Sequence, residues 1–123
     1  MKTRYQDCAS YLTKDGSEIR ELMHPDQHGN VKQSLAEAII HPGQKTQRHR
    51  HRESEELYFV TQGAGRMTLD NNVFTIAVGD TVLIAPGTPH CVEATGTSPL
   101  HILCCCSPAY QHDDTEILAE DLG

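Results

Sequence analysis

Short apolar runs separated by turn residues make up most of the chain from Gln33 onward. Within these runs apolar and polar residues alternate, and each run is too short for a stable helix, so the pattern is typical of strands. The runs predict eight strands, at residues 33–41, 47–51, 55–61, 66–69, 73–77, 81–84, 90–94 and 100–106. Glycine, proline, asparagine and aspartate separate them, and the Asn71-Asn72 pair predicts a tight hairpin.

The two ends of the chain have a weaker pattern. Residues 1–32 are expected to form an N-terminal arm with one strand near residues 19–23, and residues 107–123 a C-terminal tail. The best helix candidate, residues 115–122, is short. We therefore predict a single all-β domain covering residues 33–106, built as an antiparallel β-barrel or sandwich.

Charge and composition narrow the possible functions. The formal net charge is -7, with 17 acidic residues against 10 lysines and arginines, which argues against general affinity for nucleic acid. No apolar stretch is long enough to cross a bilayer, and the polar N-terminus does not resemble a secretory signal. We expect a cytoplasmic protein with no membrane partner.

One basic cluster stands out against this acidic background: Lys45, Arg48, Arg50 and Arg52. If the histidines between these arginines face a barrel interior, strand alternation points the arginines outward. Glu53 and Glu55 are close enough in sequence to neutralise them. We interpret the cluster as a solvated or subunit-contact face.

The five cysteines do not form a disulfide framework, because their number is odd and three of them, Cys104, Cys105 and Cys106, are consecutive. Reduced thiols that pack as small apolar side chains are expected. Cys91 follows His90 directly, so it should point to the opposite face of its strand.

Candidate metal ligands lie on the predicted strands. His49 and His51 are two residues apart, so both imidazoles project to the same face, about 6 to 7 Å apart along the backbone. Glu56 begins the next strand and shares a face with Tyr58, while His90 opens a later strand after a Pro-Gly turn. Three imidazoles and one carboxylate near strand ends could bind one metal ion.

These residues carry a resemblance to the cupin superfamily. The first cupin motif, Gly-X5-His-X-His-X3–4-Glu-X6-Gly, matches from Gly43 through His49, His51 and Glu56 to Gly63. The second motif, Gly-X5-Pro-X-Gly-X2-His-X3-Asn, matches from Gly79 to His90 and departs at two positions, where Ala85 replaces proline and Ala94 replaces asparagine. Neither of these two positions is a metal ligand in the family.

The resemblance implies a fold and a ligand set. It predicts a cupin barrel, also described as a double-stranded β-helix or jelly roll, with metal ligands His49, His51, Glu56 and His90. Glu55 is the rival carboxylate, but only Glu56 has six residues before Gly63. Tyr58 is a candidate proton donor or acceptor, although packing is the more common role of an aromatic residue on such a face.

The implied cofactor is one divalent transition metal: Mn, Fe, Ni, Co or Zn. The expected function is that of a metal-dependent dioxygenase, isomerase or lyase (decarboxylase) on a small oxygenated carbon substrate. The alternative is a non-catalytic metal- or sugar-binding module. Small side chains at Ser34, Ala36 and Ala38 should leave room inside the barrel. A homodimer involving the N-terminal arm is also expected.

Overall fold

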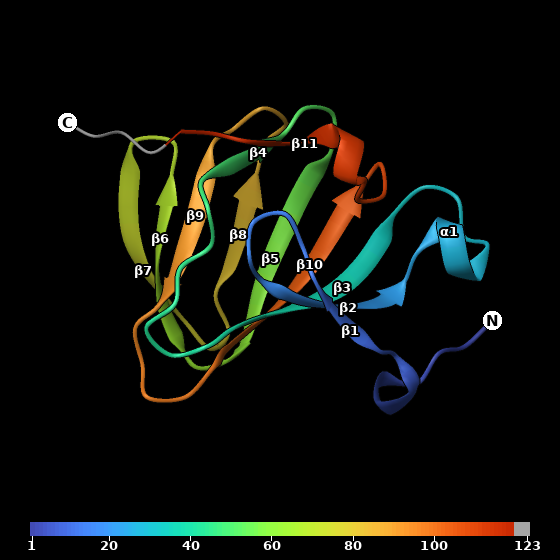
Figure 1. Cartoon of the computed structure of the whole chain (residues 1–123), viewed down its shortest axis with the longest axis horizontal. Helices are drawn as coiled ribbons and strands as arrows, with labels where there is room; N and C mark the ends of the chain where they lie inside the picture. The colour runs from blue at the N-terminus through green and yellow to red at the C-terminus, as the bar shows by residue number, and fades with distance from the viewer. Residues whose placement is uncertain (120–123) are drawn as a thin grey trace.

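The computed structural model describes residues 1–119 and consists almost entirely of two antiparallel sheets (Figure 1). The six-stranded sheet has the order β1 (Ser10–Leu12), β2 (Glu18–Met23), β3 (Ser34–Ile40), β10 (Leu100–Ser107), β5 (Glu55–Gln62) and β8 (Thr81–Ile84). The five-stranded sheet has the order β11 (Thr115–Ile117), β4 (His49–His51), β9 (His90–Ala94), β6 (Ala64–Leu69) and β7 (Asn72–Ala77). One helical turn, α1 (Pro25–His28), and two 3₁₀ turns, Tyr5–Asp7 and His112–Asp114, complete the described elements. The all-β prediction is confirmed.

All eight predicted strands of the barrel are present, with small shifts at their ends. The predicted hairpin also forms, but Leu69 pairs with Asn72, so its loop is Asp70-Asn71. Asp70 takes the positive φ, 55°, that such a tight loop needs.

The helix candidate at 115–122 is wrong where the structure describes it. Thr115–Ile117 is strand β11, which pairs with β4 from Thr115↔His51 to Ile117↔His49. Pairing with an open strand edge outweighs the weak helical preference of so short a segment. Residues 120–122 of that candidate lie outside the described residues.

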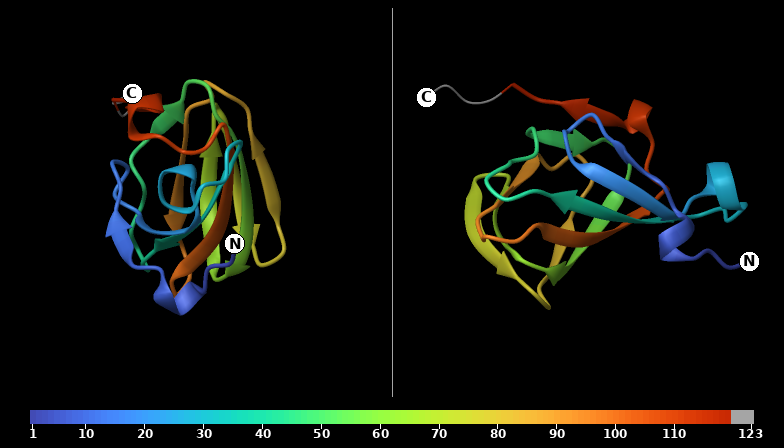
Figure 2. Two further views of the ribbon diagram at one scale, coloured as in Figure 1. Left: turned by 90° about the vertical axis from the view of Figure 1, so that its right-hand side faces the viewer. Right: turned by 60° about the horizontal axis from the view of Figure 1, so that its bottom comes forward.

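The inner faces of the two sheets enclose a common interior (Figure 2). Strand β5 shows the alternation, since Glu56, Tyr58 and Val60 are buried whereas Leu57 and Phe59 are exposed. The largest side chains that are fully buried are those of Met67, Ile84, Leu100, Ile102, His90 and Val60. Apolar residues thus close one part of the barrel, and both polar and apolar residues line the cavity in the rest.

A close backbone approach explains the glycine at the end of the first motif. Gly63 has φ +81°, and a Cβ atom there would lie 2.5 Å from the carbonyl oxygen of Pro99. Any other residue would both strain the backbone and push the β9–β10 connection away. Gly63 therefore allows the β5–β6 turn to lie directly against the β9–β10 connection.

The N-terminal arm extends the six-stranded sheet. It forms two strands rather than the single one predicted near 19–23, and β2 pairs with β3. The turn between β1 and β2 reaches the other sheet, where the Gln47 amide donates to the Asp15 carbonyl at 2.8 Å. The arm consequently brings Asp15 and Glu21 to the interior.

The arginines of β4 point outward as expected, but their partner differs from the prediction. Arg50 and Arg52 both contact Glu116 Oε2, at 3.0 and 3.2 Å, rather than Glu53 or Glu55. The reason is that β11 runs beside β4 and places Glu116 opposite Arg50. Within residues 1–119, no helix has the length and apolar character needed to cross a membrane.

Candidate metal centre

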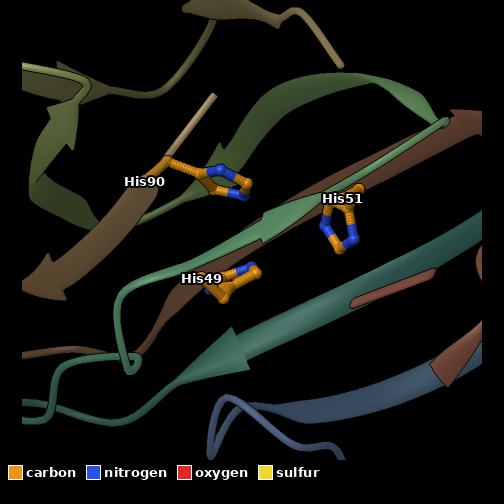
Figure 3. A group of neighbouring side chains, drawn as sticks. All are labelled: His49, His51 and His90. Carbon is orange, nitrogen blue, oxygen red and sulfur yellow. The ribbon is translucent and has the colours of Figure 1, made fainter. Parts of the chain in front are cut away.

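Three histidines from two neighbouring strands meet inside the barrel (Figure 3). His49 on β4 pairs with His90 on β9, and alternation along β4 puts His51 on the same face as His49. One nitrogen from each ring lies within 4.8 Å of the others, and all three residues are buried. The spacing predicted from the sequence therefore does bring these imidazoles together.

Hydrogen bonds at Nδ1 fix the orientation of two of the rings. His49 Nδ1 lies 2.7 Å from the Gln47 carbonyl, and His90 Nδ1 lies 2.9 Å from the Thr88 carbonyl. A carbonyl oxygen only accepts, so each Nδ1 carries the proton. In the neutral ring this leaves the Nε2 lone pair free for a metal ion.

A relay through Thr115 orients the third ring. The Thr115 hydroxyl donates to the Gln111 carbonyl at 3.0 Å, so its oxygen is left to accept from His51 Nδ1, also at 3.0 Å. His51 thus has the same tautomer as the other two histidines. The C-terminal strand supplies this contact.

Glu56, not Glu55, supplies the carboxylate beside the imidazoles. Glu56 Oε1 lies 3.2 Å from His51 Nε2 and 3.5 Å from His90 Nε2. Glu56 is buried on the inner face of β5, whereas Glu55 is exposed on the outer face. The alternation of strand side chains separates the two candidates.

The donor set fits a cation. The Nε2 atoms of His51 and His90 lie beside Glu56 Oε1. Both Glu56 Oε1 and His90 Nε2 are buried without a hydrogen-bond partner among the described residues. Such a group of acceptors is costly to bury unless a positive ion lies between them. Imidazole and carboxylate suit divalent transition metals.

The protonation states favour the same interpretation. Burial, and then the neighbouring His90, lower the pKa of His49 to about 4, so this ring is neutral near pH 7. Burial alone would raise the pKa of Glu56, but the imidazoles of His51 and His90 lower it, so Glu56 is ionised. Neutral imidazole and ionised carboxylate are the forms that bind metals. His51 differs: burial lowers its pKa, but the hydrogen bond and charge of Glu56 outweigh burial and raise the pKa overall, so a metal ion would compete with a proton at this ring.

Two further residues at this site carry no signal in the motif. The Cys106 thiol donates to Glu56 Oε2 at 3.2 Å, in addition to the packing role predicted for the cysteines. Asp15 Oδ2 lies 3.4 Å from His49 Nε2, while its other oxygen accepts hydrogen bonds from Thr13 and Ser17. Asp15 is distant in sequence, and only the position of the β1–β2 turn reveals it.

The centre opens into a cavity with a volume of about 40 Å³. Ser34, Ala36 and Ala38 line it, as their small size predicted. Tyr58 lines it too, with its ring edge-on to His90 at 6.0 Å between centroids. Burial, and then the charge of Glu56, raise the pKa of Tyr58 well above its usual value, so the phenol keeps its proton.

The two-sheet barrel, with a three-histidine cluster at the predicted motif positions, defines a cupin-type protein. Residues 36–106 match the family model described as the cupin domain, and the chain belongs to this family. Its sequence is 55% identical over 118 residues to an uncharacterized protein of Methanocaldococcus jannaschii, covering 96% of this chain and 94% of the relative.

Solved structures with the same fold carry the names of enzymes. A predicted oxalate decarboxylase from Thermotoga maritima superposes with a TM-score of 0.77 at 22% identity, covering 88% of this chain and 99% of that one. The polyketide cyclase RemF from Streptomyces resistomycificus gives a TM-score of 0.82 at 16% identity, covering 99% and 87%. At these identities the likeness establishes the fold alone.

Proposed function

We propose that this protein is a metal-dependent enzyme acting on a small oxygenated carbon compound, with His49, His51, His90 and Glu56 holding one divalent transition-metal ion. The supporting observation is the buried cluster of three imidazoles beside a cavity, with Glu56 Oε1 next to two of them, His51 and His90. These ligands suit Mn²⁺, Fe²⁺, Co²⁺, Ni²⁺ or Zn²⁺.

Such an ion would supply Lewis-acid polarisation of a carbonyl or enediol, or a binding position for dioxygen. Dioxygenase, isomerase and lyase or decarboxylase reactions are all compatible with that chemistry. The chain's own residues orient the substrate, and the closed interior limits access of bulk water. Cys106 holds the free oxygen of Glu56, which keeps the carboxylate directed at the imidazoles.

Tyr58 is our candidate proton donor. Its ring packs against His90, and it lines the same cavity as the proposed ligands. Asp15 Oδ2 offers a hydrogen-bond acceptor on the β1–β2 turn. A donor and an acceptor beside the same centre favour an isomerase or lyase over a dioxygenase, because both of those reactions move protons on a hydroxylated substrate.

The test begins with metal analysis of the purified protein, followed by a substrate screen with and without oxygen. In Co²⁺-loaded protein, millimolar acetohydroxamic acid should change the visible spectrum, because open coordination positions accept it. An unchanged four-coordinate spectrum would mean a closed structural ion, and the enzyme proposal would fail.

The role of Tyr58 is tested separately, with a substrate found in the screen. Tyr58→Phe should lower kcat without lowering metal content; unchanged kcat would mean that Tyr58 takes no part in the reaction.

We also infer that the chain forms a homodimer through the outer face of the six-stranded sheet. Leu35, Leu57 and Leu83 are exposed and lie in one row across β3, β10, β5 and β8, with Phe59 exposed nearby. A contiguous apolar row, unlike scattered surface residues, is typical of an interface. Sedimentation equilibrium should give a dimer mass, and Leu57→Glu a monomer; a monomeric wild type would contradict the inference.

A further inference from the structure

A second polar group faces the cavity, on a different strand from the metal ligands. Glu21 on β2 is 7% exposed, and its Oε1 accepts a hydrogen bond from the Tyr11 hydroxyl at 2.7 Å. Its other oxygen, Oε2, is buried and has no hydrogen-bond partner among the described residues. A buried carboxylate oxygen is costly to leave unpaired, so this atom needs a donor.

The strand register places Glu21 across the cavity from the metal centre. Glu21 pairs with Ala36, Ala36 with Cys104, and Cys104 with Tyr58, so these four residues form one inward row over β2, β3, β10 and β5. Three strand spacings amount to about 14 Å along the sheet. The short side chains of Ala36 and Cys104 leave the space between Glu21 and Tyr58 open to the cavity.

Glu21 and Tyr110 line this cavity and also a second one, whose volume is about 220 Å³. Glu21 therefore contributes to the lining of both cavities.

The charge of the inner cavity restricts the ligand. Three carboxylates line it, those of Asp15, Glu21 and Glu56, and no lysine or arginine is found among its lining residues within the described chain. The two positive charges of a divalent ion would not balance them. An anionic group far from the metal would meet repulsion, whereas a hydroxyl can donate to Glu21.

We propose that Glu21 is a substrate-binding residue whose free oxygen accepts a hydrogen bond from a neutral, polyhydroxylated compound of sugar size. This inference rests on the proposed metal-dependent function, because the opposite end of the compound is taken to lie at the metal centre. It adds a substrate class: neutral sugars or polyols are selected, and sugars with a carboxylate at the far end are rejected.

The test uses two pairs of probes that share a skeleton: glucose with glucuronate, and galactose with galacturonate. Calorimetry on metal-loaded protein should show binding of at least one neutral sugar. In metal-free protein, where the uronate carboxylate has no ion to coordinate, the uronate should bind at least about tenfold more weakly than its neutral partner, the effect of exchanging one charged hydrogen bond for repulsion. This wild-type comparison does not depend on how well any variant folds.

The Glu21→Gln variant keeps the size of the side chain and removes its charge. It should weaken binding of the neutral sugar by roughly tenfold. It should also reduce the difference in affinity between the neutral sugar and its uronate. Glu37→Gln is the matched control, because Glu37 is also a buried carboxylate that accepts from a tyrosine hydroxyl, that of Tyr5, but it does not line the cavity. It should leave both affinities unchanged.

Metal content measured on the same samples separates the two proposals. Absence of bound metal would count against the proposed enzyme, and the sugar titrations of metal-free wild type and Glu21→Gln would still report on Glu21. The substrate class is overturned if no neutral sugar binds metal-loaded protein, if a uronate binds metal-free protein as tightly as its neutral partner, or if Glu21→Gln changes neither affinity.

Discussion

Replacing Thr115 by valine tests whether the C-terminal strand tunes the metal centre. Valine has nearly the same shape but no hydroxyl, so His51 Nδ1 loses its acceptor in a site where both residues are about 95% buried, with exposures of 4% and 5%. The ring can then rotate or move its proton to Nε2, and either change removes the lone pair needed by a metal ion.

Loss of such a supporting contact to a metal-binding histidine costs about 10- to 100-fold in affinity, or roughly 1.4 to 2.7 kcal/mol. The stability of the metal-free protein should fall by about 1 to 2 kcal/mol, because the hydrogen bond to the Gln111 carbonyl is lost as well. Competition with a chromophoric chelator gives the affinity for Zn²⁺ or Co²⁺, and urea unfolding of the metal-free protein gives the stability.

Thr46→Val is the matched control for this prediction. Thr46 is 5% exposed and lines the same cavity, but its hydroxyl oxygen accepts from the Val92 amide rather than from an imidazole. It should lose comparable stability and keep its metal affinity. Equal metal affinity in wild type and Thr115→Val, or equal losses in both variants, would refute the reasoning.

Four further predictions concern the same centre. His90→Ala should reduce bound metal to well below one ion per chain by elemental analysis; wild-type content would contradict its assignment as a ligand. Glu56→Gln should lose metal while Glu55→Gln keeps it, and the reverse result would mean that the register of β5 is misassigned. Cys106→Ala should weaken metal binding by up to about tenfold, as expected for a group that positions a ligand; chelator competition that finds no change would reduce the thiol to a packing role. Metal at 100 times its Kd should stabilise the fold by about 2.7 kcal/mol and raise Tm on the order of 10 °C, and an unaffected Tm would argue against a site formed only in the folded state.

The sequence predicted the barrel and the motif residues well because both follow from local regularities. Alternation of apolar and polar residues located strands such as Thr81–Ile84 and His90–Ala94, whose bounds are the predicted ones. The fixed spacing of His49, His51 and His90 likewise translates into shared faces once the strands are known. Alternation allows only one of the adjacent glutamates to face inward, and the six-residue spacing to Gly63 selected Glu56.

The residues that were missed reach the centre through long-range pairing. Asp15 and Glu21 belong to an arm whose sequence has few apolar residues, and Thr115 belongs to a segment that was predicted only as a C-terminal tail. Their contacts depend on which sheet edges β2 and β11 cover, and that is decided by tertiary pairing rather than by local propensity. No spacing rule along the chain encodes those positions.

Both ends of the chain contribute residues to the cavity wall, and these residues lie outside the region that the family shares. The matched cupin region, residues 36–106, contains all four proposed ligands but neither Glu21 nor Thr115. A chimera that kept residues 34–106 and exchanged residues 1–33 and 107–119 for those of another cupin would retain the four proposed ligands, replace the Thr115 contact to His51, and acquire a different pocket wall. Specificity in this protein can therefore diverge through its termini without any change in the motif by which the family is identified.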